Sequence, residues 1–490
     1  MANFSDLVNV SFQDTTSHQS VVGGDILGVI LPSHWGPSEE LNLLNRSEFF
    51  ERYPEALPLG VKVTDAPTDF YYAYSQVKKY FDNGGSQVEI YRPNLGDKYF
   101  GVTKGEYAVT LKYPGSIPTN LLPVGTTKVK LTVTDTEVVL VAEGDASITL
   151  ERWQGQFTDP GAVDSGQFTH FTKVLTQSQL LQCVESDDVT VTEVNDYIGA
   201  YTYPSISATA LSPIVDKFAD IEQSQATLLI SPLPSSTELN TAVANVAEQT
   251  KTRVAIIGCP LDTLPSTLET VAQTLPKGNK FTINVFGIEF VSVFSTRVRS
   301  NCVGGYCGAL ANIANLVRVN QIASAKTYGA YNGALAVSPS FNQVLAFHEL
   351  GITSVYNSTT GPQLFGVHNS LYTQKPNSYF AKSNVSRVLA AILRNIYPVA
   401  FEAIHTDAAA NAITRASFAS RFNSVINDFI ARQNLQSDSY ADLSDAINTD
   451  YLTKGGTVLN AILSLHFIGL VEKIDIKIVA TDSSVNVEII

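Results

Sequence analysis

Residues 96–200 differ in character from the sequence on either side of them, and this difference constrains the fold more than any other feature. Before and after them, short apolar segments alternate with amphipathic ones, as in VAIIGCP followed by TLPSTLETVAQTL. Strands that alternate with helices in this way predict a mainly parallel sheet with helices packed on it. We therefore expect an α/β core built from two parts of the chain, residues 21–95 and 201–385.

Within residues 96–200, apolar residues recur at every second position. The clearest examples are KVKLTVT and EVVLVAE, which lie between Gly, Pro and Asp turns. A period of two is typical of strands with one buried face. We expect an inserted β-rich domain here, after which the α/β pattern resumes with ATLLISP.

The first part of the core is expected to begin with a strand at Asp25 and a turn. A short helix, RSEFFERY, a longer helix, YYAYSQVKKYFDNGG, and a strand, SQVEIYRP, then follow. Ser47 can cap the short helix, because serine side chains accept hydrogen bonds from the free N–H groups of a first helical turn. Gly84 and Gly85 can end the longer helix, since glycine tolerates the left-handed conformation found there. The predicted order is β-α-α-β.

The C-terminal part, residues 386–473, predicts an α+β domain. Two long helix candidates, NVSRVLAAILRNIYPVAF and RASFASRFNSVINDFIARQN, precede a shorter one, DLSDAIN, and a strand-like run, VLNAILSLHFI. Residues 474–490 follow as a terminal arm with two segments in which apolar and polar residues alternate, which is typical of half-buried strands. The apolar positions of this alternation are Ile474, Ile476, Ile478, Val485, Val487 and Ile489.

The first 20 residues are polar, with few apolar side chains, among them Val8, Val10 and Phe12. Such a segment has too little apolar surface to fold alone. Fully extended, it spans about 66 Å at roughly 3.3 Å per residue, whereas a compact chain of this length has a radius of gyration of about 23 Å. We expect residues 1–20 to form an N-terminal arm that can reach a neighbouring subunit.

The composition of the chain disfavours several classes of function. A chain of 490 residues is longer than one hydrophobic core usually supports, so more than one domain is expected. The share of hydrophobic residues, 44% against 16% charged, indicates folded domains whose surfaces are partly covered by partners. The net charge of −14 and the lack of a basic cluster disfavour nucleic acid as a partner. Four cysteines are too few for a disulfide framework, and the sequence shows neither a signal-peptide pattern nor an apolar run long enough for a membrane span. We expect the protein to remain in the cytoplasm where it is made.

Few residues form a catalytic or ligand-binding motif. Cys302 and Cys307 come nearest to a metal motif, but a zinc site needs two further ligands beside such a pair. Gly304, Gly305 and Gly308 offer the glycine spacing of a phosphate-binding loop, but the Lys and Ser or Thr of a P-loop and the spacing of a dinucleotide fingerprint are missing. We interpret the thiols as small buried side chains beside glycines that allow close packing. No metal and no cofactor is expected.

Several motifs spread along residues 21–490 carry a resemblance to a known family. The first two are GVILPSHWGPSEELNLLNRSEFFERYP and YFDNGGSQVEIYRP, the second a helix ending in Asn-Gly-Gly followed by a strand ending in Arg. Later ones are NCVGGYCGALANI, HELGITSVYNSTTGPQLFGVHNSL and SNVSRVLAAILRNI, which contains Arg387. In this order they resemble the sheath proteins of contractile phage tails, as in myoviruses. LKYPGSIPTNLLPV departs from the family, because Ile117 to Asn120 stand where Trp-Gly-Asn is common.

The resemblance implies a structural protein and not an enzyme. In that family the N-terminal arm and the C-terminal strand enter the C-terminal domains of adjacent subunits. The expected assembly is a homo-oligomer of stacked rings or a helical sheath around the tail tube protein, with baseplate and tail terminator proteins as further partners. It is located in the virion tail, is assembled in the host cytoplasm, and contracts to drive the tube through the host envelope during genome ejection. The implied contact residues are Val8, Val10, Phe12, Ile474, Ile476, Ile478, Val485, Val487 and Ile489.

Three alternatives stay open at the level of sequence. The terminal strands can be ordinary edge strands that pair within their own domain. The chain can be a doubly wound α/β enzyme with its active site near Cys259, Gly287 or Gly304, at the carboxyl ends of parallel strands. It can also be the sheath of a related contractile injection system, including a type VI system.

Overall fold

The computed structural model describes most of the chain and divides it into two compact units. Described are residues 25–61, 68–157, 169–194, 206–316, 318–324, 328–403, 406, 411–444, 448, 459–469, 476–480 and 485–489. The first unit contains the described residues of 25–315 and 322–391, and the second contains those of 316–321 and from 392 onward.

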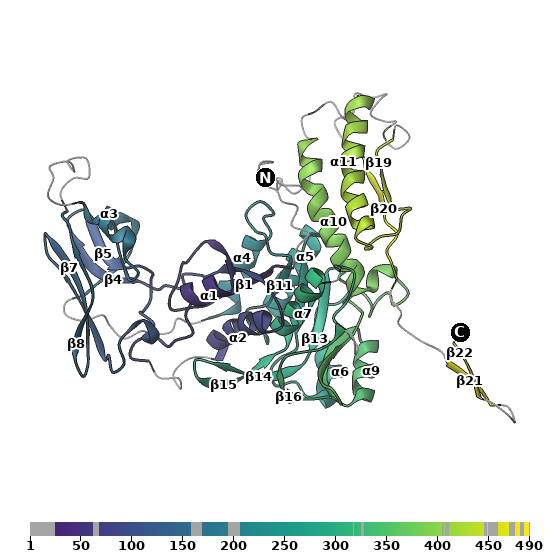
Figure 1. The fold of residues 1–490 in the computed structure, drawn as a ribbon, viewed down its shortest axis with the longest axis horizontal. Coiled ribbons are helices and arrows are strands. Elements are labelled where there is room, and N and C mark those ends of the chain that lie inside the picture. Colours follow the sequence, from purple (N-terminus) through teal and green to yellow (C-terminus); the bar gives the residue numbers. More distant parts are fainter. Residues whose placement is uncertain are drawn as a thin grey trace. The chain divides into compact units, whose positions relative to one another are not determined.

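An eight-stranded sheet forms the centre of the first unit (Figure 1). Its order is β18-β17-β13-β12-β11-β1-β3-β2, and the six inner strands are parallel to their neighbours, whereas the edge strands β2 and β18 are antiparallel. The prediction of a mainly parallel sheet is therefore confirmed. The strands are β1 (Leu27–Ile30), β2 (Leu41–Asn45), β3 (Gln87–Tyr91), β11 (Leu228–Ile230), β12 (Val254–Gly258), β13 (Thr282–Phe286), β17 (Ile352–Ser358) and β18 (Gly361–Phe365).

Helices surround this sheet, and every residue of β1, β11, β12 and β13 is buried, as expected for parallel strands covered on both faces. Serine side chains cap three of these helices: Ser207 accepts from Ala210 N, Ser236 from Leu239 N and Ser340 from Gln343 N. The helices are α1 (Arg46–Arg52), α2 (Thr68–Asp82), α4 (Ala208–Val215), α5 (Thr237–Thr250), α6 (Leu268–Ala272), α7 (Val303–Leu316), α9 (Phe341–Glu349) and the long α10 (Ser383–Glu402).

The start of the core differs from the predicted order in two details. A second strand, β2, lies between the turn and α1, so the order is β-β-α-α-β. The cap of α1 is Asn45 and not Ser47, which lies inside the helix. Asn45 accepts from Glu48 N at 3.1 Å and its own N–H donates to Glu48 Oε2 at 2.8 Å, a reciprocal capping box. The predicted end of α2 is confirmed, since Gly84 follows it with φ of 97°.

A small antiparallel sheet, which the sequence reading did not assign, lies against α2. It contains β14 (Ile288–Val293), β15 (Thr296–Asn301) and β16 (Ala334–Val337) in the order β15-β14-β16. The turn between β14 and β15 places Phe294 and Ser295 at positive φ values of 51° and 59°. Two successive residues with positive φ are typical of tight hairpin turns.

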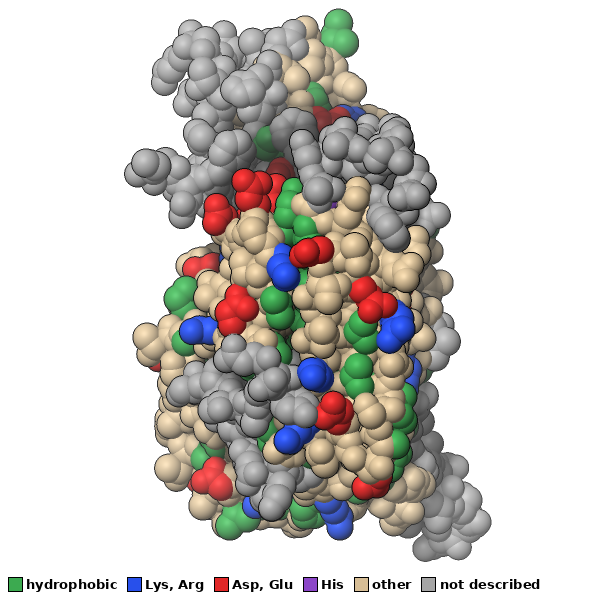
Figure 2. Space-filling view, turned by 90° about the vertical axis from the view of Figure 1, so that its left-hand side faces the viewer, with side chains coloured by type: hydrophobic (Ala, Val, Ile, Leu, Met, Phe, Trp, Pro, Cys, Tyr) green, Lys and Arg blue, Asp and Glu red, His purple; other side chains and the backbone are tan. Residues whose placement is uncertain are grey.

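The inserted segment is β-rich, as predicted. Four strands form the sheet β10-β4-β5-β9 and three form the sheet β6-β7-β8, with Val109, Leu131, Leu140 and Phe171 fully or almost fully buried in one apolar cluster. Figure 2 views this part of the chain, where acidic and basic side chains are interspersed among the described residues. The elements are β4 (Tyr99–Lys104), β5 (Tyr107–Leu111), β6 (Lys128–Val133), β7 (Glu137–Glu143), β8 (Ser147–Gln154), α3 (Phe171–Val174), β9 (Leu181–Glu185) and β10 (Val191–Glu193).

The second unit contains the end of α10, the helix α11 and four short strands. The two long helix predictions are confirmed, whereas the predicted helix DLSDAIN is wrong at its start, because Asp442 ends a strand and Leu443 and Ser444 have no regular structure. Only part of VLNAILSLHFI forms a strand. The elements are α11 (Ala412–Ala431), β19 (Tyr440–Asp442), β20 (Ile462–Ser464), β21 (Ile476–Ala480) and β22 (Val485–Ile489).

Candidate subunit interfaces and the buried networks behind them

One side chain of α11, that of Asn423, forms hydrogen bonds with the antiparallel ribbon of β19 and β20. The Asn423 amide on α11 donates to Ala441 O at 3.0 Å, and its carbonyl accepts from Ala441 N at 2.8 Å. Ala441 lies opposite Leu463 in the ribbon. Because both backbone groups of Ala441 are bonded to Asn423, they cannot face β20, so this is a pair without mutual hydrogen bonds.

The geometry of this pair determines which edge of the ribbon is open. In an antiparallel pair of this kind, the N–H and C=O of both residues point away from the partner strand. Asn423 therefore covers the outer edge of β19, whereas the N–H and C=O of Leu463 point outward from β20 and have no hydrogen-bond partner among the described residues. Tyr440 and Ile462 are 52% and 51% exposed on the ribbon. The β20 edge can accept a further strand.

The last two strands pair with each other. β21 and β22 form an antiparallel hairpin in which Ile476 lies opposite Ile489 and Ile478 lies opposite Val487. In the described part of the chain neither strand pairs with any other strand, so each has an unpaired outer edge. Val485, a further predicted contact residue, lies opposite Ala480. The remaining predicted contact residues, Val8, Val10, Phe12 and Ile474, lie outside the described residues.

The first described residue, Asp25, is bound to the start of α10 within the first unit. Its carboxylate accepts from the Arg387 guanidinium at 2.6 Å, and Arg387 also donates to Leu310 O at 3.2 Å. The Tyr80 hydroxyl donates to Asp25 O at 2.6 Å. The Arg387 side chain is only 1% exposed. This arrangement fixes the point at which the chain enters the core, and it gives the basic residue of the SNVSRVL motif a structural role.

Arg92, the last residue of the IYR motif, is completely buried. Its guanidinium donates to the carbonyl oxygens of Ser33 at 2.6 Å, Gly36 at 2.9 Å and Pro114 at 2.9 Å, and it forms an ion pair with Asp97 at 2.8 Å. A planar group with five N–H donors suits such a position, because it can bond several backbone carbonyls at once. Arg92 therefore joins the core to the first residues of the inserted segment.

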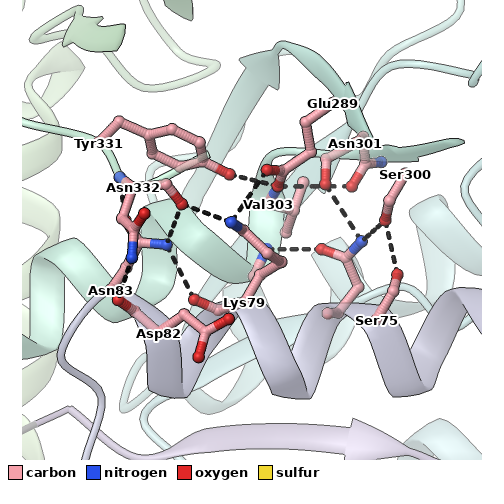
Figure 3. A network of polar contacts seen from close by, with 12 residues as sticks. Ser75, Lys79, Asp82, Asn83, Glu289, Ser300, Asn301, Val303, Tyr331 and Asn332 are labelled. Atoms are coloured by element: carbon pink, nitrogen blue, oxygen red, sulfur yellow. Dashed lines mark hydrogen bonds and ion pairs between the residues drawn. The ribbon is translucent and has the colours of Figure 1, made fainter. Parts of the chain in front are cut away.

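A buried polar network connects α2 with the small sheet (Figure 3). The Lys79 ammonium lies 3.2 Å from a carboxylate oxygen of Glu289 and also donates to Asn332 O, while the Tyr331 hydroxyl donates to Glu289. Asn83 accepts from Asn332 N at 2.8 Å. Burial raises the pKa of the Glu289 carboxyl to about 7, and the Lys79 charge opposes this shift.

A second set of contacts continues the network toward α7. Gln76 donates to Ser300 Oγ and accepts from Gly304 N, both at 2.6 Å, and Ser75 shares a hydrogen bond of 2.6 Å with Ser300 (Figure 3). A Cβ atom on Gly304 would lie 2.1 Å from Gln76 O, so only glycine allows this approach of α7 to α2. This agrees with the interpretation of the glycines as close-packing residues.

The region considered for an enzyme site is filled by its own side chains. Cys259, Cys302 and Cys307 are fully buried free thiols. Burial raises the pKa of Cys259 to about 12, which keeps the thiol protonated at neutral pH and makes it a poor nucleophile. A Cβ atom on Gly287 would lie 2.8 Å from Cys302 Sγ. Among the described residues no group of three His, Cys, Asp or Glu could hold a metal ion.

The sequence reading did not find Asn423, Lys79 or Glu289. Asn423 occupies a helix position whose partner is a strand residue 18 positions later, and Lys79 and Glu289 come from distant parts of the chain. The only available signal was a lysine and a glutamate within otherwise buried elements. No described helix is long and apolar enough to span a membrane.

Comparisons with known proteins rest on structure alone. No protein-family model matches the sequence, and no curated protein matches it by sequence. Solved structures do match. The sheath tail protein of Listeria innocua is 13% identical with a TM-score of 0.55, over 87% of this chain and 90% of that chain. The sheath tail protein of Desulfitobacterium hafniense is 15% identical with a TM-score of 0.52, over 89% and 93%.

A third solved structure matches over an even larger part of the chain. The sheath complex of an extracellular contractile injection system, in its contracted state, is 10% identical with a TM-score of 0.54, over 97% of this chain and 94% of that chain. At such low identities the likeness concerns the fold and not the function in detail. The resemblance expected from the motifs is thereby confirmed at the level of structure: this chain has the fold of contractile tail sheath proteins.

Proposed function

We propose that this chain is the structural subunit of a contractile phage tail sheath and that it polymerises with copies of itself around a tail tube. The observation that carries the proposal is the combination of the sheath fold with the edge of β20, which has no partner strand in the described part of the chain. Strand addition to such an edge provides main-chain hydrogen bonds of about 0.5–1.5 kcal/mol each. Repeated around every ring, these bonds link the subunits while the cores move as rigid bodies.

The strand that completes the ribbon comes from a neighbouring copy. The C-terminal segments β21 and β22 are donors of the right kind, because each has an unpaired edge and an alternating sequence that fixes its register. We propose that Ile476, Ile478, Val485, Val487 and Ile489, with Ile474, belong to this donated element. Val8, Val10 and Phe12 in the N-terminal arm are proposed to serve a second neighbour.

The proposed sheath surrounds a tail tube protein and ends at baseplate and tail terminator proteins. Contraction drives the tube through the host envelope, and the chain itself needs neither a cofactor nor a catalytic residue. In the assembled particle the inserted β-rich domain is proposed to face outward and the C-terminal domain to face the tube. The particle is assembled in the host cytoplasm and the subunit ends in the virion tail.

A sheath of an extracellular contractile injection system is the second candidate, favoured by the match over 97% of the chain. The two candidates differ in the particle and not in the subunit. Particles isolated from the source and viewed by electron microscopy distinguish them, because only a phage tail is joined to a capsid.

The strand-addition step can be tested at Leu463. We expect Leu463→Pro to abolish the tubes or rings that the wild-type chain forms in negative-stain micrographs. Proline removes the outward N–H and leaves the β19–β20 ladder intact, because that N–H is not used within the ribbon. Leu463→Val keeps the N–H and should assemble normally. Normal tubes from the proline variant would refute strand addition at β20.

The donor is tested by deleting residues 474–490. The truncated chain should remain a folded monomer with the circular dichroism spectrum of an α/β protein, and it should not polymerise. Assembly of the truncated chain at the wild-type concentration would show that the C-terminal segment is not the donated element.

A further inference from the structure

The small sheet of β14, β15 and β16 has one face packed on α2 and one face exposed. On the packed face, Glu289 lies opposite Ser300, and both belong to the buried network. The exposed face carries the intervening residues. Phe290 lies opposite Arg299, and Ser292 lies opposite Arg297. Figure 1 shows α2 along one side of β14 and β15.

Two arginines dominate this exposed face, which we call the arginine face. The Arg297 guanidinium lies 4.0 Å from the centre of the Phe290 ring, and Arg299 is directly across from the same ring. Both arginines are exposed, and neither forms an ion pair with a described residue. Contact with an aromatic ring orients a guanidinium and leaves its N–H donors available. Both side chains can therefore bind carboxylates.

The arginine face has a rigid support. Glu289 and Ser300, which alternate with the exposed residues, are tied to Lys79 and Gln76 on α2. A surface that is already ordered loses less entropy when a partner binds. The position of the arginines on strands of a supported sheet thus favours a permanent contact over a transient one.

The charge of the chain indicates the partner. With a net charge of −14, a second copy of this chain presents mainly carboxylates. One dense group lies in the inserted domain, where Glu185 ends β9 and Asp187 and Asp188 follow it. Ser186 N donates to Glu106 O at 2.9 Å, which brings a fourth carboxylate to this end of the domain. All four acidic residues are exposed and form no ion pair with a described residue.

We propose that the arginine face, Arg297 and Arg299, binds the acidic group Glu106, Glu185, Asp187 and Asp188 of a second copy of this chain. The inference rests on the proposed function, because it assigns one of the contacts between sheath subunits. It is independent of strand addition, which involves the C-terminal unit. Opposite charges in such a contact fix the relative position of two subunits and suppress wrong pairings.

Charge reversal tests this pairing from both sides. We expect Arg297→Glu/Arg299→Glu to raise the protein concentration needed for assembly by about tenfold or more, because like charges then meet at the contact. Asp187→Lys/Asp188→Lys should do the same. The variant with all four changes should assemble at close to the wild-type concentration, as the charges are exchanged. Sedimentation at two salt concentrations measures each threshold, and the wild-type threshold should rise with salt.

Lys217→Glu/Lys251→Glu is the matched control, because it changes the net charge by the same amount as the arginine pair, at two exposed positions outside both the small sheet and the inserted domain. It should assemble like the wild type. If the fourfold variant fails to assemble although each pair alone is folded, the acidic group is not the partner of the arginine face.

Other outcomes separate this inference from the proposed function. If the wild-type chain forms neither tubes nor rings, the proposed function fails. If the wild type assembles and Arg297→Glu/Arg299→Glu assembles equally well, only the arginine-face inference fails. Binding of this face to a tube protein or to nucleic acid, lost in the same variant while self-assembly is unchanged, would also overturn it.

Discussion

The eight-stranded core sheet and the β19–β20 ribbon differ in how their backbone edges are satisfied. In the core, six parallel strands each have two neighbours, and antiparallel strands close both sides. In the ribbon, a single side chain, Asn423, covers one edge, and the edge of β20 has no partner among the described residues. An open edge is a template for another strand. The core can thus be stable alone, whereas the ribbon keeps an edge to which a further strand can be added.

Buried ion pairs of the core can also be compared with an exposed pair of the C-terminal unit. In the core, Arg92 and Arg387 have guanidinium groups that are at most 1% exposed and are paired with Asp97 and Asp25. In the C-terminal unit, the pair of Arg432 and Asp428 is 45% and 43% exposed. Exposed pairs contribute little to stability, whereas breaking a buried pair leaves an uncompensated charge. Substitution at either buried pair should therefore change stability more than substitution at the exposed pair.

The largest effect is expected from Arg387→Met. It leaves the Asp25 carboxylate without its ion-pair partner, and breaking a buried pair in this way lowers the free energy of unfolding by about 3–5 kcal/mol. Urea unfolding followed by tryptophan fluorescence and circular dichroism measures the change. Arg432→Met is the control and should change the free energy by about 0.5 kcal/mol or less. Equal effects of the two substitutions would show that the buried pair contributes no more to stability than the exposed pair.

A smaller and pH-dependent effect is expected at Glu289. Its pKa of about 7 in the folded chain lies above the ordinary value of 4.5, so the folded state binds the proton more tightly than the unfolded state. The resulting stabilisation is complete below pH 4.5 and is lost as the pH rises through 7. The full difference corresponds to about 3 kcal/mol.

Glu289→Gln cannot titrate at this position and should remove that contribution. The unfolding free energy of the wild type, relative to the variant, should therefore fall by up to about 3 kcal/mol between pH 4.5 and pH 7.5. Urea unfolding at several pH values provides the two profiles. Parallel profiles for the two proteins would contradict a buried carboxyl with a raised pKa.

Sequence periodicity predicted the elements whose residues are buried in a regular pattern. VAIIGCP became β12, because a parallel strand covered on both faces reads as a short apolar run. Period-two alternation likewise predicted β6 and β7 of the inserted domain. These elements depend on local pattern and burial alone, so the sequence was sufficient for them.

Elements that depend on side-chain contacts across the chain could not be predicted in this way. The small sheet pairs β14 with β16, although β14 precedes α7 in the sequence and β16 follows it. The position of this sheet on α2 depends on the contact between Lys79 and Glu289. The open edge of β20 depends on one amide, that of Asn423, bonding Ala441. No period in the sequence indicates such a bond. Even the cap of α1 was misplaced by two residues, because Asn45 and Ser47 are both favourable caps.

The smallest effect concerns that cap. Asn45→Ala removes the acceptor for Glu48 N and should lower the free energy of unfolding by about 1 kcal/mol. Ser47→Ala is the matched control, since Ser47 lies inside α1 and alanine is a good helix former, so stability should stay unchanged or rise slightly. Because α1 belongs to the core, both variants should still polymerise like the wild type. A loss of stability in the serine variant alone would place the cap at Ser47. A loss of polymerisation in either variant would show that the core and the assembly surfaces depend on each other more than their hydrogen bonding indicates.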